Sequence, residues 1–334
     1  MLILQVLFYI ILVMILLVII FLLVKLLQLK SGKKRAAEKL DSIPVKKISS
    51  LGTVDKLTVI PLVDYYTDNK ELRTEAGVSY LIEVDDKKIL MDTGLNKNQE
   101  HPSPLLHNLH ALGYSEKDID LIFISHLHLD HVGGKKDEKD DSFSISQGPV
   151  DLPKIPVYAP VPLKPSVWNP GPEVNVIEEP TRLDRGIASI GIIPRHLFLL
   201  GETLEHSLAI NVAGKGIVII VGCGHQSVEK ILERASSLFD EPIYGLIGGL
   251  HFPVKGGRMN IGPLNLQHIV ASDNPPWKGL DEKSVDQAII TIKNKGIKVI
   301  SLSAHDSSDW SLERFQNAFQ DSYLPLKVGE KIII

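Results

Sequence analysis

The chain has 334 residues and a formal net charge of −4, and 44% of its residues are hydrophobic, which is ample for a buried core. This length suits one large domain or two modest ones, and the slightly acidic balance gives no basic surface for nucleic acid. A single cysteine, Cys223, excludes an internal disulfide and is compatible with a reducing compartment.

The first segment differs from everything after it. Residues Leu2 to Val24 contain no charged side chain. As a helix this run would be about 34 Å long, which is enough to cross the core of a bilayer. It lacks the charged front and the small-residue cleavage site of a signal peptide. The sequence therefore predicts a transmembrane anchor over residues 1–27.

A basic stretch follows the apolar run and predicts its orientation. The charges are Lys25, Lys30, Lys33, Lys34, Arg35, Lys39, Lys46 and Lys47. The positive-inside tendency places this side in the cytoplasm, so we expect a single-pass cell-membrane protein with its amino terminus outside. Residues 28–55 are expected to form a basic linker, either touching anionic headgroups or acting only as a stop-transfer flank. Residues 56–334 would then form a cytoplasmic catalytic domain.

The chain beyond the linker alternates between strand and helix patterns. Short apolar runs bounded by turn residues predict strands at 57–62, 79–84, 88–91, 118–125, 156–158, 208–211, 216–221, 243–247 and 298–302. Longer amphipathic stretches predict helices at 104–112, 228–237, 280–295 and 311–319. We expect residues 135–153 to form a surface loop and 255–279 a lid or substrate loop. The pattern suits an α/β fold of two packed sheets with helices outside.

The densest group of metal-capable side chains follows the predicted strand at 118–125. It consists of His126, His128, Asp130 and His131. Imidazole nitrogens suit zinc, iron or manganese, and a carboxylate adds charge for a second cation. The alternative is a solvated polar loop, which the H-x-H-x-D-H spacing directly after a strand disfavours.

Other predicted strands end in a small-residue turn that carries a polar group. The turns are Asp92-Thr93-Gly94, Gly222-Cys223-Gly224-His225, Ala304-His305-Asp306 and, more weakly, Gly248-Gly249-Leu250-His251. Strand ends are where functional groups are usually mounted on a rigid sheet. The sequence therefore favours one site built from several strand ends.

These motifs together resemble the metallo-β-lactamase fold superfamily. Within it they are most similar to the branch related to the 7,8-dihydropterin-6-yl-methyl-4-(β-D-ribofuranosyl)aminobenzene 5'-phosphate synthases. The resemblance covers residues 56–334 and includes Glu75-Ala-Gly-Val-Ser79, Met91-Asp-Thr-Gly94, the histidine cluster, Ile193-Pro-Arg195, Gly222-Cys-Gly-His225, Gly248-Gly-Leu-His251 and His305. It implies an αββα sandwich of two mixed sheets with outer helices, preceded here by the transmembrane helix.

The resemblance also implies a binuclear metal site. A first ion would be held by His126, His128 and His225, and a second by Asp130, His131 and His305. The expected cofactor is zinc, as one or two ions, with manganese or iron as alternatives. Asp92 would orient the ligands from outside, and Asp130 or His251 would assist proton transfer as catalytic residues.

Several of these residues have an alternative role that the sequence leaves open. Asp92 could equally be a turn-forming aspartate, and His251 a packed histidine at a strand end. His225 could be a histidine at the start of a helix, before Ser227, and His305 a loop histidine. Many binuclear hydrolases of the superfamily place a metal-bridging aspartate where this chain has Cys223, so the bridge would be a thiolate, a water or nothing.

The function implied is that of a membrane-anchored metallo-hydrolase. It would use a metal-activated water on a small anionic molecule, such as a phosphoester or a pterin-phosphate-like compound. Two alternatives stay open: a dihydropterin–arylamine synthase of the same branch, and a non-catalytic metal-binding membrane sensor. The expected partners are the small-molecule substrate and, through the N-terminal helix, membrane lipid, with no nucleic acid.

Overall fold

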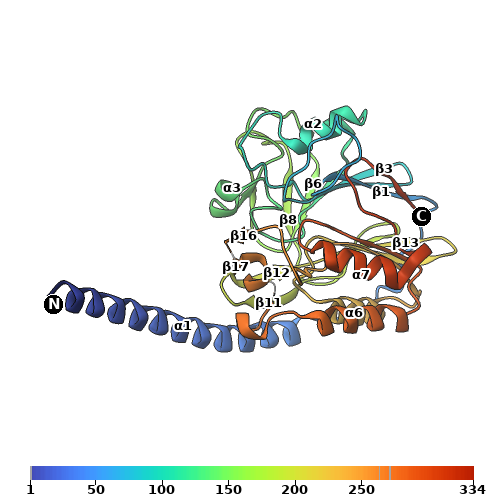
Figure 1. The fold of residues 1–334 in the computed structure, drawn as a ribbon. Coiled ribbons are helices and arrows are strands. Elements are labelled where there is room, and N and C mark those ends of the chain that lie inside the picture. The colour runs from blue at the N-terminus through green and yellow to red at the C-terminus, as the bar shows by residue number, and fades with distance from the viewer. Residues whose placement is uncertain (1, 263, 271) are drawn as a thin grey trace.

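A computed structural model describes residues 2–262, 264–270 and 272–334. Two β-sheets lie face to face in it, with helices on their outer faces (Figure 1). The helices are α1 (Leu2–Ser42), α2 (Pro104–Ala111), α3 (Lys135–Lys139), α4 (Val228–Leu238), α5 (Leu266–Val270), α6 (Glu282–Asn294) and α7 (Asp309–Phe319). The predicted α/β sandwich is therefore confirmed.

The first sheet combines an antiparallel hairpin region with parallel strands. Its spatial order is β19 (Ile332–Ile333), β1 (Leu57–Val63), β2 (Ser79–Val84), β3 (Lys87–Met91), β4 (Leu121–Phe123), β6 (Pro156–Ala159) and β8 (Glu173–Val176). Strands β1, β2 and β3 pair antiparallel, whereas β3, β4, β6 and β8 pair parallel. The carboxyl ends of β3 and β4 therefore lie at the same edge.

The second sheet is also mixed. Its spatial order is β18 (Val299–Leu302), β15 (Ile243–Gly248), β14 (Gly216–Val221), β13 (Leu208–Val212), β10 (Ile187–Ser189) and β9 (Thr181–Asp184). Strands β14, β15 and β18 pair parallel, so their carboxyl ends also share one edge. Smaller pairs are β5 (Ser142–Phe143) with β7 (Lys164–Pro165), β11 (Ile193–Leu197) with β12 (Gly201–Glu205), and β16 (Asn260–Ile261) with β17 (Leu264–Asn265).

Three apolar layers hold the sandwich together. Between the sheets, side chains such as Tyr80 and Phe123 meet Ile220. A second layer packs α4, α6 and α7 against the outer face of the second sheet, and a third packs α2 against the first sheet. Burial of apolar area is the main stabilising term in such a fold. The layers hold the strand ends at fixed positions.

The linker expected at residues 28–55 is helical as far as Ser42. The helix α1 continues without a break from the apolar segment through the basic stretch, and Pro44 follows its end. Leu29, Gly32 and Ala36 are buried against the body of the domain. The first part of the predicted linker is therefore a docked helix, because small and apolar residues on one side of it pack on the domain.

The loop expected at residues 135–153 is another difference. It contains α3 and β5, and Phe143 and Ile145 are fully buried in the layer beneath α2. Most of its charged residues lie in or next to α3, whereas Val150 and Leu152 are buried. The segment is therefore part of the core and not a surface loop.

Candidate metal centre

Strand ends from both sheets meet at one edge of the sandwich. His126 and His128 follow β4 in the chain, and His225 follows β14. The ring centroid of His225 lies 5.2 Å from that of His126 and 5.0 Å from that of His128. Behind β18 stands His305, whose ring centroid lies 5.4 Å from that of His131. The predicted strand-end residues are thus brought together from distant parts of the chain.

Ring nitrogens in this cluster are buried without partners. His131 Nε2, His225 Nδ1 and His305 Nε2 have no hydrogen-bond partner among the described residues. His126 Nε2 and His128 Nδ1 lie 2.9 Å apart. A buried polar atom without a partner is costly, so nitrogens that converge in this way fit a cation that the fold would hold between them. The donor set of imidazoles suits a divalent transition metal.

Cys223 lies at the centre of the cluster. Its Sγ belongs to three sets of ligand atoms in which all members lie within 4.8 Å of one another. The other members are His126 with His225, His131 with His305, and His251 with Asp306. His128 lies beside His126, and the Asp130 carboxylate lies 3.8 Å from His131 Nε2, at the more exposed side. Cys223 therefore occupies the space between the two predicted ligand sets.

Asp92 orients the cluster from the end of β3. Its carboxylate accepts hydrogen bonds from the backbone N–H of Ser125 at 2.7 Å, from Ser125 Oγ at 2.7 Å and from His131 Nδ1 at 2.8 Å. The residue has a φ of 60°, a left-handed conformation that is unfavourable for most side chains. Asp92 therefore contacts a proposed ligand, which is the position that the predicted orienting role requires.

The carboxylates around His131 favour a positive charge at this point, which an ion held at Nε2 would supply in place of a proton. Burial alone would lower the pKa of His131, but the Asp92 and Asp130 carboxylates outweigh it and raise the pKa to about 9. Burial lowers the pKa of His225 and His305 well below the ordinary value, so these rings stay neutral. Neutral imidazoles with free lone pairs are what metal coordination requires.

A second carboxylate relay was not anticipated from the sequence. Asp64 follows β1, is fully buried and accepts a hydrogen bond from Ser303 Oγ. Ser303 Oγ lies 2.7 Å from His305 Nδ1, so Asp64 positions His305 through the serine. The sequence signal was present, because Asp64 follows a strand just as Asp92 does. Outer partners of this kind fix ligand orientation.

Two more buried carboxylates line the cluster. Asp306 accepts from the backbone N–H of His251 at 2.9 Å and from Ser307 Oγ at 2.9 Å. Glu205, at the end of β12, accepts from the backbone N–H groups of Cys223 at 3.0 Å and Gly224 at 2.8 Å, while its Oε2 has no partner among the described residues. Glu205 therefore shapes the turn that carries the central cysteine.

Glu205→Gln is expected to remove part of the pH dependence of stability in the metal-free chain. Burial raises the pKa of Glu205 to about 7. The folded state then binds more protons than the unfolded state between about pH 4.5 and 7, so the free energy of unfolding falls as pH rises through that window. A shift of this size corresponds to on the order of 3 kcal/mol.

Denaturant unfolding of the full chain in detergent with a chelator would measure this effect. The glutamine variant should lose less stability on going from acidic to neutral pH than the wild type. Glu202→Gln, at an exposed position on the same hairpin, should keep the wild-type dependence. An unchanged pH dependence in the Glu205 variant would contradict the assignment.

A cavity of 280 Å³ opens beside the cluster. His225 and His251 line it together with Arg195, Leu250 and Phe252. His251 Nδ1 lies 3.1 Å from Cys223 Sγ, its Nε2 has no partner among the described residues, and burial lowers its pKa to about 4. A neutral His251 at the wall of a cavity is placed to accept a proton or contact a substrate.

The segment at 255–279 covers part of the site. Gln267 Nε2 donates to the backbone oxygen of His305 at 2.7 Å, and Arg258 Nε donates to that of Ala304 at 2.9 Å. Ser272 lines the cavity. Residues 263 and 271 of the predicted lid lie outside the described residues. The described part of the segment therefore packs on the strand end that carries His305.

Other features of the molecule can be separated from this centre. His206 is held by Ser189 Oγ and the backbone oxygen of Ile124, both at 2.9 Å, and is therefore a packed structural histidine.

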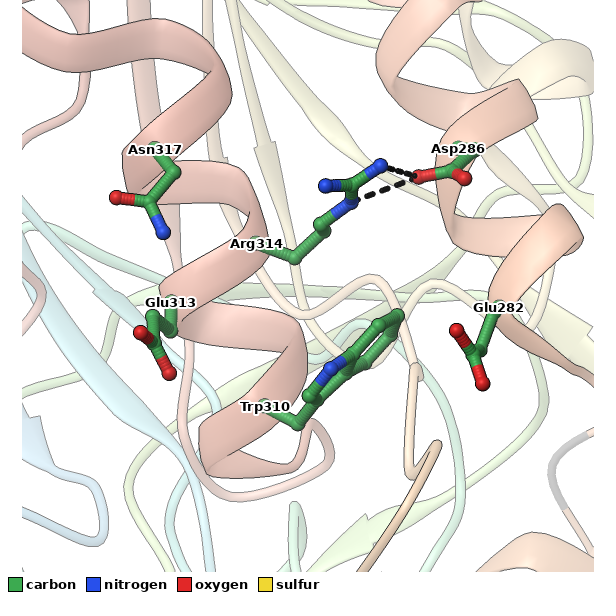
Figure 2. A pocket seen from close by; sticks show the side chains of 6 residues that line it. All are labelled: Glu282, Asp286, Trp310, Glu313, Arg314 and Asn317. Carbon is green, nitrogen blue, oxygen red and sulfur yellow. Dashed lines mark hydrogen bonds and ion pairs between the residues drawn. The ribbon is translucent and has the colours of Figure 1, made fainter.

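Figure 2 shows a pocket between α6 and α7, of 340 Å³, lined by Glu282, Asp286, Trp310, Glu313, Arg314 and Asn317. Arg314 pairs there with Asp286 at 2.8 Å. No histidine or cysteine lines that pocket, so it is not part of the metal centre.

Known proteins are similar to this chain in sequence and in fold. Residues 72–140 match the family described as the metallo-beta-lactamase superfamily. A 7,8-dihydropterin-6-methyl-4-(beta-D-ribofuranosyl)-aminobenzene-5'-phosphate synthase of Methanocaldococcus jannaschii is 27% identical over 242 residues, 61% of this chain and 80% of that protein. An uncharacterised protein of the same organism, MJ0448, is 27% identical over 204 residues, 55% of this chain and 76% of that protein.

A solved structure has the same architecture. It is Tm1679, described as a metal-dependent hydrolase of the beta-lactamase superfamily. The two chains superpose with a TM-score of 0.54 at 18% sequence identity, covering 83% of this chain and 99% of the other. The sandwich described above is therefore the fold that the sequence motifs led us to expect.

Proposed function

We propose that this chain is a member of the metallo-β-lactamase superfamily and a membrane-anchored, metal-dependent hydrolase of a small anionic molecule, which the family match and the shared fold support. The observation that carries the proposal is the convergence of buried imidazole nitrogens without partners at one edge of the sandwich. Such a set of donors is costly in the absence of a cation and is suited to holding one.

The proposed ligands follow from the positions of these donors. His126, His128 and His225 would hold one ion, and His131, His305 and Asp130 a second, with Cys223 between them. When bound, zinc or a similar divalent cation would supply a Lewis acid and would lower the pKa of water to about 7. The metal that such a site binds depends on which metals are available as well as on the type of donor atom, so manganese and iron are alternatives to zinc.

The chain's own residues would bind and orient the substrate and move protons. Asp130 has a partly exposed carboxylate close to His131 and would accept a proton from the attacking water. His251 is neutral and lines the cavity, so it would contact the leaving group, to which Asp130 would return the proton taken from the water. Arg195 places a guanidinium at the cavity and pairs with Asp273 at 2.9 Å. An anionic substrate such as a phosphoester would take the place of Asp273 as the partner of this guanidinium.

The proposed anchor is the apolar part of α1. The helix Leu2–Ser42 has a mean hydropathy of 3.6 in its most apolar window, and none of that window is buried in the domain. An exposed apolar helix of this length is unfavourable in water and favourable in a bilayer. The lysines after it would keep the catalytic domain on the cytoplasmic side of the cell membrane.

Metal-dependent turnover tests the proposal. The full chain in detergent, stripped with a chelator and reloaded with zinc or manganese, should bind one or two ions and hydrolyse a generic phosphodiester. His128→Ala should lose both properties. If the wild type binds no metal after reloading, the proposal fails. If it binds metal but both proteins are equally inactive over a broad substrate panel, the sensor alternative is favoured.

A second function is favoured by one specific observation, the synthase relative that is 27% identical to this chain. In that case the centre would join a dihydropterin to a phosphorylated aminobenzene riboside. Incubation with both compounds and detection of the coupled product would identify it. Coupled product without phosphodiester hydrolysis would replace the hydrolase proposal.

A further inference from the structure

The β11–β12 hairpin lies along the carboxyl-terminal half of α1 (Figure 1). The contact is close at Gly32, where an added Cβ atom would stand 2.2 Å from Cγ of His196. Only glycine admits the ring at this distance. Leu29 and Ala36, one turn to either side, are also buried. The hairpin is therefore packed tightly on the helix.

Strand β11 runs antiparallel to α1, so the tip of the hairpin points toward the apolar segment of the helix. Ile193, at the start of β11, belongs to the core against which Leu40 packs, whereas His196 lies on Gly32. Burial lowers the pKa of His196. Two cations from opposite ends of this contact, Arg35 and Lys25, lower this pKa further. Moving along β11 therefore leads back along α1 toward its amino end.

The tip reaches the level at which the apolar run ends. Strand β11 ends at Leu197, and Leu199, in the middle of the turn, is three residues beyond His196, which is at most about 10 Å. The same distance along a helix is at most about seven residues, which leads from Gly32 toward Lys25. In agreement, Leu22, Lys25 and Leu26 are half-buried, although the rest of the apolar run is exposed. Domain atoms therefore lie beside α1 at the boundary between its apolar and basic parts.

The turn at this boundary carries exposed leucines. Leu199 is 38% exposed and Leu200 is 48% exposed, while the preceding Phe198 is 4% exposed and fixes the turn to the domain. Single exposed leucines are common on protein surfaces. Two in succession, held rigidly beside an apolar helix at the end of its apolar run, are placed where the interfacial layer of a bilayer would begin.

We propose that Leu199 and Leu200 enter the interfacial layer of the bilayer that α1 spans, as a second membrane contact of the domain. This inference rests on the proposed membrane anchor. A bilayer is favoured over a second copy of the chain because the leucines continue directly from the exposed apolar surface of α1. The exposed lysines at 30 and 34 add attraction to anionic headgroups at the same boundary.

Depth-dependent quenching of a fluorophore tests the inference in the full chain. Cysteine is introduced singly by Leu200→Cys, Ile15→Cys and Ile333→Cys, labelled with an environment-sensitive dye, and reconstituted into vesicles that contain anionic lipid. Native Cys223 is 2% exposed, and wild type treated with the same dye checks that it does not react. Ile15 reports on the anchor, and Ile333, 73% exposed at β19 on the far edge of the domain, is the matched control.

We expect lipids spin-labelled near the headgroup to quench the dye at position 200 at least twofold more than the dye at 333. Lipids labelled deep in the acyl chain should quench position 15. Quenching at 15 with equal signals at 200 and 333 would overturn the second contact and leave the anchor intact. No quenching at 15 would overturn the anchor and the inference together. A blue shift at 200 without lipid quenching would indicate a second copy and also overturn the inference.

Discussion

Replacing His225 with alanine should remove metal binding from one half of the centre and lower turnover by more than roughly 100-fold. Loss of a partner outside the ligands already costs roughly 10- to 100-fold in affinity or activity. His225 Nδ1 is buried, has no partner among the described residues and stands near His126 and His128. Metal analysis after dialysis and steady-state turnover would measure the two effects.

In the metal-free chain, the same substitution should lower the free energy of unfolding by less than the loss of a buried residue whose polar atoms are all hydrogen-bonded. It removes a polar atom whose burial is unfavourable, which offsets the packing that is lost. The wild type should gain thermal stability on addition of zinc, and the variant should gain less. His110→Ala, at an exposed histidine 2.9 Å from Glu116, should change none of these quantities. Equal metal content in the two variants would contradict the proposed ligand role.

Asp92→Asn should weaken metal binding by roughly 10- to 100-fold while leaving the fold intact. The carboxylate holds Ser125 and the Nδ1 of His131, so that the other ring nitrogen faces the cluster. An amide lacks the charge that favours the cation and turns one acceptor into a donor. Titration of the metal-free protein with zinc in competition with a chromophoric chelator would give the change in affinity.

A matched control for this variant is Asp184→Asn. Asp184 pairs with Lys87 at the other end of the domain and has a side chain that is 35% exposed. The control should bind zinc as the wild type does, because an exposed ion pair contributes little. If Asp92→Asn also binds zinc as tightly as the wild type, Asp92 does not orient the ligands, and the turn-forming interpretation is correct.

The core strands and helices could be predicted because they carry strong local patterns. The strands predicted at 79–84 and 88–91 form the hairpin β2–β3, and those predicted at 208–211 and 216–221 form the hairpin β13–β14. The β11–β12 hairpin was missed because Pro194 and the polar residues of β12 give no alternating pattern. Its formation depends on packing against α1, which is a tertiary effect that a local pattern does not contain.

The residues of the candidate site also fall into those with a local sequence signal and those without one. The strand-end histidines could be predicted because a strand followed by a polar turn is a local signal, and the structure brings them together. Their role as ligands stays a prediction. Glu205 was missed, and Asp306 was named in a strand-end turn without a role, because their partners come from other strands, Cys223 for the first and His251 for the second. The role of a buried carboxylate can be assigned only when its hydrogen-bond partners in the folded structure are known.

The unbroken helix α1 has a mechanical consequence for the proposed membrane enzyme. A flexible tether of the same length would let the domain sample a volume above the bilayer at many orientations. A helix of 41 residues is about 62 Å long and behaves as a rod, and its basic half is fixed to the domain. The cavity beside His225 would then be carried at one height and one tilt. Substrate search would be confined to a thin layer along the membrane surface.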